Sequence, residues 1–245
     1  MGAKTRDITR RGAIAACLAA GLALAWAILD RGRAASTLPA YGGRPVGGDA
    51  TGQAWDDLLA PYPDAVGWVR VAGTRVEQPL MQASDDEPER WLHHAPDGSA
   101  DPEGSVFLDS RCSTSAAHAL AYGHHVGDTG RMLSDLHRAY EQATFDLVGE
   151  LTLYVRETCE VRTLAPAFAM SVDESFADIQ RFGFPDGQSL REWLSSLLAR
   201  ASAASGAADA LVASATSAVT LVTCSSERAG QRSRTLLTFC EGGGA

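Results

Sequence analysis

The chain has little positive charge for its size, and this shortage argues against one broad class of function. Its 245 residues carry 21 Lys and Arg against 30 Asp and Glu, so the formal net charge is -9 at pH 7. Proteins that bind nucleic acids gain much of their affinity by neutralising phosphates with clustered basic side chains. We therefore expect no nucleic-acid partner.

The sequence also lacks regularly spaced cysteines, internal repeats and nucleotide-type glycine loops. Its five cysteines contain no CxxC pair and follow no regular spacing: Cys17, Cys112, Cys159, Cys224 and Cys240. This pattern indicates neither a zinc site nor a small disulfide scaffold. We expect no metal and no cofactor. With 45% hydrophobic and 21% charged residues, the composition fits one globular domain and excludes a disordered or collagen-like chain.

Basic residues gather around one long apolar run near the N-terminus. The first 33 residues contain six basic and two acidic side chains, which leaves a net charge of -13 on the rest. Residues 12–29 are uncharged and mostly apolar, and at about 1.5 Å per residue they nearly cross a hydrocarbon core of roughly 30 Å. Because basic residues precede this run, we expect residues 1–11 in the cytoplasm, a transmembrane signal-anchor at 12–29 and an extracellular remainder. A signal peptide cleaved near residues 34–36 is the alternative.

The segment after the apolar run has the composition of a linker. Residues 36–52 are rich in Gly and carry two Pro, so we expect a flexible tether over residues 30–52. A short amphipathic helix is expected at residues 53–60, because Pro61 and Pro63 end it. The catalytic or binding domain is therefore expected at residues 53–245.

Short apolar runs separated by turn residues dominate this domain, and they predict a mainly β fold, either an antiparallel barrel or a sandwich. The expected strands are residues 66–71, 76–81, 105–108, 119–122, 145–148, 151–157, 161–170, 218–223 and 235–239. Helices are expected at residues 87–93, 132–140, 174–182 and 189–203. In the last of these, the apolar residues recur on one face of a helix.

Three places in this pattern hold residues able to do chemistry. In LAYGHHVGD (120–128), two histidines follow a strand end, where a general acid or base can be held rigidly. In VTLVTCSS (219–226), Cys224 ends a β-branched run. In RSRTLLTF (232–239), Arg234 directly precedes another strand. If these last two strands are neighbours, Arg234 lies near Cys224 and its permanent charge can bind an oxyanion.

Each of these features also has a purely structural interpretation. An isolated GHH is often a surface turn, and a free cysteine is commonly buried and inert. Arg234 alone is equally well explained as a solvated charge at a strand edge. The residues taken singly leave these alternatives open.

Taken together, the segments resemble sortases, and class B sortases most of all. The resemblance is carried by GWVRVAGTRVEQPLMQ (67–82), GSVFLDS (104–110), AYGHHVGDTGRMLSDLHRAY (121–140), TLVTCS (220–225) and RTLLTF (234–239). They occur in the order and at the separations seen in that family and cover residues 53–240. A Met-led helix after YGHH, and a helix-bearing insert between Met170 and Ala218, are typical of class B. The resemblance implies a closed eight-stranded β-barrel with several peripheral helices.

The resemblance also implies the residues of an active site. The family's catalytic histidine falls on His124, its nucleophile on Cys224 and its arginine on Arg234. His125 and Arg232 are the second choices for the histidine and the arginine. The two neighbours of the nucleophile are expected to bind substrate: Thr223 by lining the groove and Ser225 through its backbone N–H.

The activity implied is that of a membrane-anchored cysteine transpeptidase of Gram-positive type. Such an enzyme cleaves a C-terminal sorting signal of an exported protein through a cysteine thioester. It then transfers the acyl group to an amine of a cell-wall precursor or to a lysine of a pilin. Two other functions remain open, namely a non-catalytic, membrane-tethered binding barrel and a cysteine hydrolase. A papain-like order is disfavoured, because His124 precedes Cys224 by 100 residues.

Overall fold

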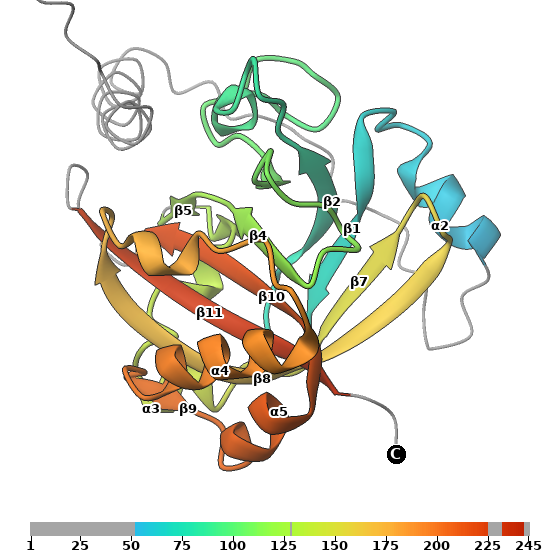
Figure 1. Cartoon of the computed structure of the whole chain (residues 1–245). Coiled ribbons are helices and arrows are strands. Elements are labelled where there is room, and N and C mark those ends of the chain that lie inside the picture. Colours follow the sequence, from blue (N-terminus) through green and yellow to red (C-terminus); the bar gives the residue numbers. More distant parts are fainter. Residues whose placement is uncertain (1–51, 128, 225–231, 243–245) are drawn as a thin grey trace, which may run out of the picture.

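Eight strands close into a barrel in the computed structural model, which describes residues 52–127, 129–224 and 232–242 (Figure 1). Around the barrel the strand order is β11-β10-β4-β3-β2-β1-β7-β8, and β8 pairs back onto β11. The expected closed, mainly β barrel is therefore confirmed. Its strands are β1 (Ala65–Val71), β2 (Glu77–Gln82), β3 (Val106–Leu108), β4 (His118–Tyr122), β7 (Leu151–Val155), β8 (Glu160–Asp173), β10 (Ala215–Cys224) and β11 (Ser233–Gly242).

Two of the strand pairs in the barrel are parallel and the others are antiparallel. β2 pairs in parallel with β3, and β4 pairs in parallel with β10. A two-residue strand, β9 (Ala203–Ala204), extends the sheet beside β8. Strands β5 (His125–Val126) and β6 (Arg131–Met132) form a separate small hairpin directly after β4. The parallel β4–β10 pair matters most for function, because both strands run toward the same end of the barrel.

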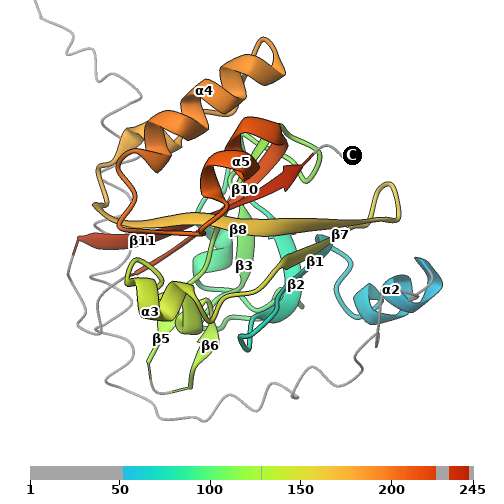
Figure 2. The same cartoon turned by 90° about the horizontal axis from the view of Figure 1, so that it is seen from below.

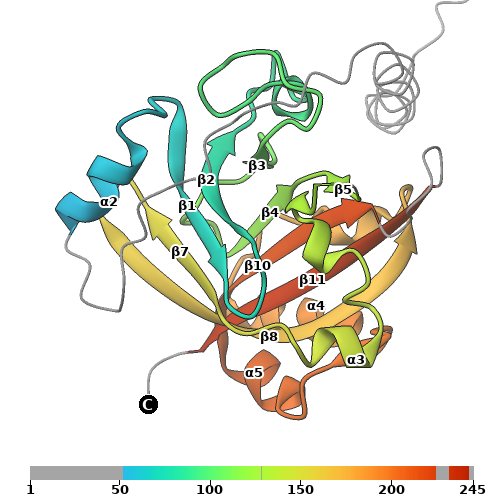
Figure 3. The same ribbon diagram turned by 180° about the vertical axis from the view of Figure 1, so that it is seen from behind.

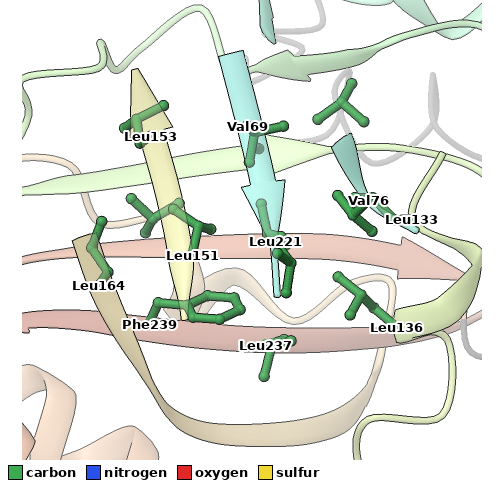
Figure 4. Packing of buried hydrophobic residues seen from close by; sticks show 14 of the residues in the cluster. Val69, Val76, Leu133, Leu136, Leu151, Leu153, Leu164, Leu221, Leu237 and Phe239 are labelled. Atoms are coloured by element: carbon green, nitrogen blue, oxygen red, sulfur yellow. The ribbon is translucent and has the colours of Figure 1, made fainter. Parts of the chain in front are cut away.

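Alternate residues of the strands fill the barrel interior. Leu151 and Leu153 of β7, Leu221 of β10 and Phe239 of β11 lie in one buried cluster (Figure 4). The intervening residues of β7 face outward, as the two-residue period of a strand requires. Leu133 and Leu136 reach the same core from the short 3-10 helix segment that follows β6. The interior is therefore packed with side chains and fixes the strand ends around it.

The outer face of β8, β10 and β11 is covered by two helices, α4 (Gly187–Leu198) and α5 (Ala208–Ser214) (Figure 2). Asp186 is the N-cap of α4, and its carboxylate accepts a hydrogen bond from the backbone N–H of Ser189 at 2.8 Å in a capping box. The expected helix at 189–203 is therefore present but begins and ends earlier. Its buried face is the predicted one and consists of Leu190, Trp193, Leu194 and Leu197.

A third packed region joins helix α2 (Gly52–Leu59) to the barrel. The ring of Trp55 stacks on that of Tyr154 with centroids 5.1 Å apart, and the Tyr154 hydroxyl donates a hydrogen bond to Asp56 at 3.1 Å. The expected helix at 53–60 is thus confirmed. It lies against the strands at the opposite side of the barrel from α4 (Figure 2).

Several expected elements were wrong in type or extent. Residues 145–148 form no strand, because α3 (Gln142–Phe145) and a turn place Phe145 and Val148 inward while Leu147 is 71% exposed. This spacing of three is that of a helical turn. The helices expected at 87–93, 132–140 and 174–182 are short 3-10 segments: η1 (Arg90–Leu92), η2 (Ser134–Leu136) and η3 (Ala177–Ile179).

The described part of the chain contains no helix with the length and apolarity of a membrane span. The signal-anchor expected at residues 12–29 and the tether expected at 30–52, except for its last residue, lie outside the described residues. Both stay predictions.

Candidate active site

The strand order brings three predicted residues to one end of the barrel. β10 lies between β4 and β11 (Figure 3). On one side, Cys224 at the end of β10 pairs directly with Arg234 of β11. On the other side, Val222 pairs with Tyr122, the last residue of β4. Since the β4–β10 pair is parallel, the chain beyond Tyr122 continues beside the chain beyond Val222, and neighbouring strands lie about 4.8 Å apart.

Gly123 continues this pairing and leads directly to His124. Its backbone N–H donates to the carbonyl of Val222 at 3.1 Å. A Cβ atom at this position would lie 2.7 Å from Cγ of Leu133 and 3.0 Å from Cγ2 of Val106. Leu133 is fully buried, so it has no room to move aside. Glycine is thus the residue that lets β4 end this close to the segment carrying Leu133.

His124 is held by backbone groups from two other segments. Its carbonyl accepts a hydrogen bond from the N–H of Leu133 at 3.1 Å, and its ring Nε2 lies 3.0 Å from the carbonyl oxygen of Leu92. A carbonyl only accepts, so Nε2 must carry a proton. The ring orientation is thereby fixed, and Nδ1 is the nitrogen left for proton transfer.

The surroundings of His124 favour its neutral form. Burial of the ring lowers the pKa of His124 most, and the charges of His93 and Arg234 lower it further. The hydrogen bond to Leu92 and the carboxylate of Asp101 act in the opposite direction. The imidazole is therefore neutral over a wider pH range than a free histidine.

Arg234 is nearly enclosed and is fixed by two acceptors. Its NH2 group donates to Oε2 of Glu174 at 2.9 Å, and its NH1 group donates to the backbone carbonyl of Ser233 at 3.1 Å. The side chains of Arg234 and Glu174 are only 11% and 9% exposed. Arg234 is thus not a solvated strand-edge charge.

The second-choice residues have other contacts. The ring of His125 stacks on that of His137, with centroids 4.1 Å apart. Arg232 is 64% exposed and pairs with Asp173 at 3.3 Å and with Glu174 at 3.2 Å. Of the two arginines, Arg234 is therefore the one enclosed beside the strand pair that ends at Cys224.

Of the two residues expected to bind substrate, Thr223 is described by the structure and Ser225 is not. Thr223 is 3% exposed, and its hydroxyl oxygen is buried with no hydrogen-bond partner among the described residues. The alternation of β10 places it on the same face as Leu221, which is in the barrel core. Ser225 lies outside the described residues. Substrate contacts by Thr223 and Ser225 stay predictions.

Three further thiols are free: Cys112, Cys159 and Cys240. Burial raises the pKa of Cys112 to about 11 and that of Cys240 to about 12. Both are therefore protonated and poorly nucleophilic at neutral pH. Over the described residues, no group of three or more His, Cys, Asp or Glu side chains is arranged to hold a metal ion.

Comparison with known proteins first gives a partial sequence match. No protein-family model matches the chain. Sortase B of Listeria monocytogenes serovar 1/2a (strain ATCC BAA-679 / EGD-e) is 29% identical over 106 residues, which cover 40% of this chain and 42% of that protein. The match therefore spans less than half of the relative's length.

Comparison with solved structures covers much more of the chain. Sortase B of Staphylococcus aureus superposes with a TM-score of 0.65 at 18% identity, over 97% of this chain and 100% of that one. A sortase B complexed with triglycine superposes with a TM-score of 0.64 at 20% identity, over 77% and 85% of the two chains. This chain has the class B sortase fold. Its sequence resemblance to class B sortases is confirmed by the Listeria relative.

Two contacts in this sortase-type barrel were missed from the sequence. Glu174 was expected only as the start of a helix, and its partner Arg234 is 60 residues away in the chain. The carbonyl of Leu92, which holds the His124 ring, is a backbone group 32 residues away. Neither contact leaves a local sequence signal, since both depend on how the barrel closes.

Proposed function

We propose that the chain is a cysteine transpeptidase of the class B sortase type. Cys224 is the nucleophile, His124 the acid and base, and Arg234 the cation that binds the oxyanion. The observation that carries the proposal is the position of β10 between β4 and β11, which makes the backbone positions of the three residues adjoin. A thiol, an imidazole and a guanidinium are together sufficient for acyl transfer through a covalent intermediate.

In the first step, the thiolate of Cys224 attacks the carbonyl carbon of the scissile peptide bond in the sorting signal of an exported protein. Negative charge develops on the carbonyl oxygen and is stabilised by the guanidinium of Arg234, which stays protonated in proteins. The C–N bond then breaks. The C-terminal part of the signal leaves as an amine, and the remainder is held on Cys224 as a thioester.

The proton needed by the leaving amine travels through His124. The Nε2–H group remains on the carbonyl of Leu92 at 3.0 Å, so Nδ1 accepts the proton from the thiol of Cys224 and delivers it to the departing nitrogen. The lowered pKa of His124 keeps the imidazole free to accept that proton at neutral pH. Atoms and charges balance, because the proton lost by the thiol is the one gained by the amine.

In the second step, an amine attacks the thioester and Cys224 is released. A sortase B of the same fold forms a complex with triglycine, which supports an acceptor with a primary amine here. The biological acceptor is either a cell-wall precursor or a pilin lysine. The C–S bond of the thioester breaks as the new amide bond forms, and neutral His124 takes the proton from the attacking amine and returns it to the sulfur of Cys224.

The proposed enzyme works outside the membrane. Residues 12–29 are the anchor, residues 30–52 the tether and residues 53–245 the catalytic domain, with residues 1–11 in the cytoplasm. The basic flank and the apolar run of the N-terminal sequence support this order. A tether keeps the catalytic domain near the membrane surface, where exported proteins emerge, and so raises its effective concentration there.

The test is turnover of defined peptides by residues 30–245, the proposed extracellular part of the chain. A panel of sorting-signal peptides is incubated with oligoglycine or with diaminopimelate, and products are followed by mass spectrometry. We expect cleavage, a ligated product that requires the amine, and loss of both with Cys224→Ala.

The same experiment separates the alternatives. Cleavage that gives only the free acid, even at high amine concentration, would identify a hydrolase. Binding of a peptide without cleavage, together with no covalent adduct on Cys224, would identify a non-catalytic binding barrel. Either result overturns the proposed transpeptidase.

A further inference from the structure

The carboxylate of Glu174 lies between two arginines beside the proposed active site. Its Oε2 accepts from NH2 of Arg234 at 2.9 Å, and its Oε1 lies 3.2 Å from Nε of Arg232. Glu174 is 9% exposed at its side chain, whereas Arg232 is 64% exposed. One carboxylate oxygen of Glu174 therefore contacts the buried Arg234, and the other contacts the solvent-exposed Arg232.

Backbone contacts also hold Glu174 in position beside Arg234. Glu174 directly follows β8, which pairs with β11 so that Val172 lies opposite Arg234. The backbone N–H of Glu174 donates to the carbonyl of Arg232 at 2.6 Å. The β8–β11 ladder thus fixes the position of the carboxylate relative to Arg234, and Arg234 is itself paired with Cys224.

We propose that Glu174 is a positioning residue that holds the guanidinium of Arg234 in the orientation required to bind the oxyanion. This inference rests on the proposed transpeptidase function. A preorganised donor stabilises a developing charge without reorganising during the reaction. With NH2 on Glu174 and NH1 on the Ser233 carbonyl, the plane of the guanidinium is set before substrate binds. A long arginine side chain without these acceptors would sample several rotamers.

Glu174 also has an electrostatic effect that makes the inference testable. Glu174 pairs with Arg234, whose backbone pairs with that of Cys224, so we expect its negative charge to oppose ionisation of the Cys224 thiol, while its contact with Arg234 assists the transition state. Removing the charge therefore changes two measurable quantities in opposite directions. Cys224 ionises more readily and reacts faster with a small alkylating reagent, but peptide cleavage slows.

The experiment compares Glu174→Gln with Asp173→Asn in the full chain. Both variants remove one negative charge, but Asp173 is 52% exposed and its ion pair is with Arg232. For Glu174→Gln we expect kcat to fall roughly 10- to 100-fold, as for loss of a residue that orients a catalytic group, with little change in KM. Alkylation of Cys224 by iodoacetamide, followed by peptide mapping, should reach half its maximal rate at a lower pH than in the wild type. Asp173→Asn should leave both quantities near wild type.

A second variant keeps the inference falsifiable if Glu174→Gln is less stable. On an Arg234→Ala background, Glu174→Gln should cause no further loss of kcat, because Glu174 acts through Arg234. Three results would overturn this inference but not the proposed function. They are an unchanged kcat in Glu174→Gln, a loss of kcat in Asp173→Asn as large as in Glu174→Gln, and an additive loss of kcat in the double variant. A parallel loss of cleavage and of Cys224 alkylation also overturns it, since the inference requires the two quantities to change in opposite directions. Absence of cleavage by the wild type overturns the proposed function and this inference with it.

Discussion

The backbone of Cys224 pairs with that of Arg234 across strands β10 and β11. Strand β10 is also the parallel neighbour of β4, which leads through Gly123 to His124. Two of the three candidate residues, Cys224 and Arg234, therefore lie in neighbouring strands of the closed sheet, and His124 lies just beyond the end of the third strand. The following predictions test that assembly and the stability of the fold around it.

Replacing Arg234 should be far more harmful than replacing Arg232. Loss of one oxyanion donor lowers kcat by about 10²- to 10³-fold, and we expect a loss of this size for Arg234→Ala. Arg232 is 64% exposed and supports Arg234 only through Glu174, so Arg232→Ala should cost much less. The measurement is kcat with the best sorting-signal peptide, with the two variants compared at equal folded fraction. Equal losses would disprove the assignment of the oxyanion cation.

Gly123→Ala should destabilise the fold and disturb His124. The added methyl group would lie 2.7 Å from Cγ of Leu133, and overpacking of this kind costs about 1–3 kcal/mol. Urea unfolding should show the loss, and cleavage should fall with it because Leu133 also binds the His124 carbonyl. Gly183→Ala is the control, since a Cβ there meets nothing within 4 Å. A Gly123→Ala variant as stable as Gly183→Ala would contradict the close packing.

Stability should fall in acid partly because of His118. This side chain is fully buried, its ring centroid lies 4.6 Å from that of Trp193, and burial lowers the pKa of His118 to about 4. Well above pH 6.5 both folded and unfolded chains hold it neutral, so its titration has no effect there. Between about pH 6.5 and 4 only the unfolded chain takes up the proton, which destabilises the fold by up to about 3 kcal/mol.

The measurement for His118 is the free energy of unfolding between pH 7 and pH 4 in the wild type and in His118→Gln. The variant is expected to be less stable at pH 7, because His118 bonds the carbonyl of Arg181 at 2.9 Å and the hydroxyl of Thr220 at 3.0 Å. Its stability should nevertheless decline less steeply with acid. Parallel pH curves for the two proteins would rule out His118 as a source of the acid sensitivity.

The ion pair of Arg162 and Glu241 should contribute strongly to stability. Arg162 is 8% exposed at its side chain and binds Glu241 at 2.6 Å. Removing one partner of a buried pair costs about 3–5 kcal/mol, because the other charge is left without compensation. Since Glu241 is 27% exposed, we expect Glu241→Ala to fall at the low end of that range. The exposed pair of Arg138 and Glu141 is the control, and Arg138→Ala should cost less than about 1 kcal/mol in thermal unfolding.

Strands and the long helix were predictable because they bury one face against the barrel. Short apolar runs bounded by turn residues located β10 and β7, and the spacing of Leu190, Trp193, Leu194 and Leu197 located α4. The two-residue period of a strand places Thr223 on the same side of β10 as Leu221, and its contact with substrate stays a prediction. The spacing of apolar residues in a strand or helix therefore predicts which of its side chains are buried, up to the last residue of the element.

Contacts between distant segments were not predictable in this way. The pairing of Glu174 with Arg234 spans 60 residues, and Glu174 lies in an irregular segment where a helix was expected. The 3-10 segment Ser134–Leu136 likewise spans only a single 3-10 turn and is fixed by Leu133 and Leu136, which enter the barrel core. Tertiary packing decides such segments, and a short sequence window does not contain the groups against which they pack.

The closing β8–β11 pair makes the candidate site depend on completion of the whole ring. Strand β11, the last strand in the chain order of the described residues, closes the ring by pairing with β8, and the parallel partner of β10 is contributed by residues about a hundred positions earlier. Contacts of such long range form late in folding. Before β11 docks, the segment that carries Cys224 therefore lacks its pairing with the segment that carries Arg234, and we expect the proposed activity to appear only once the ring has closed.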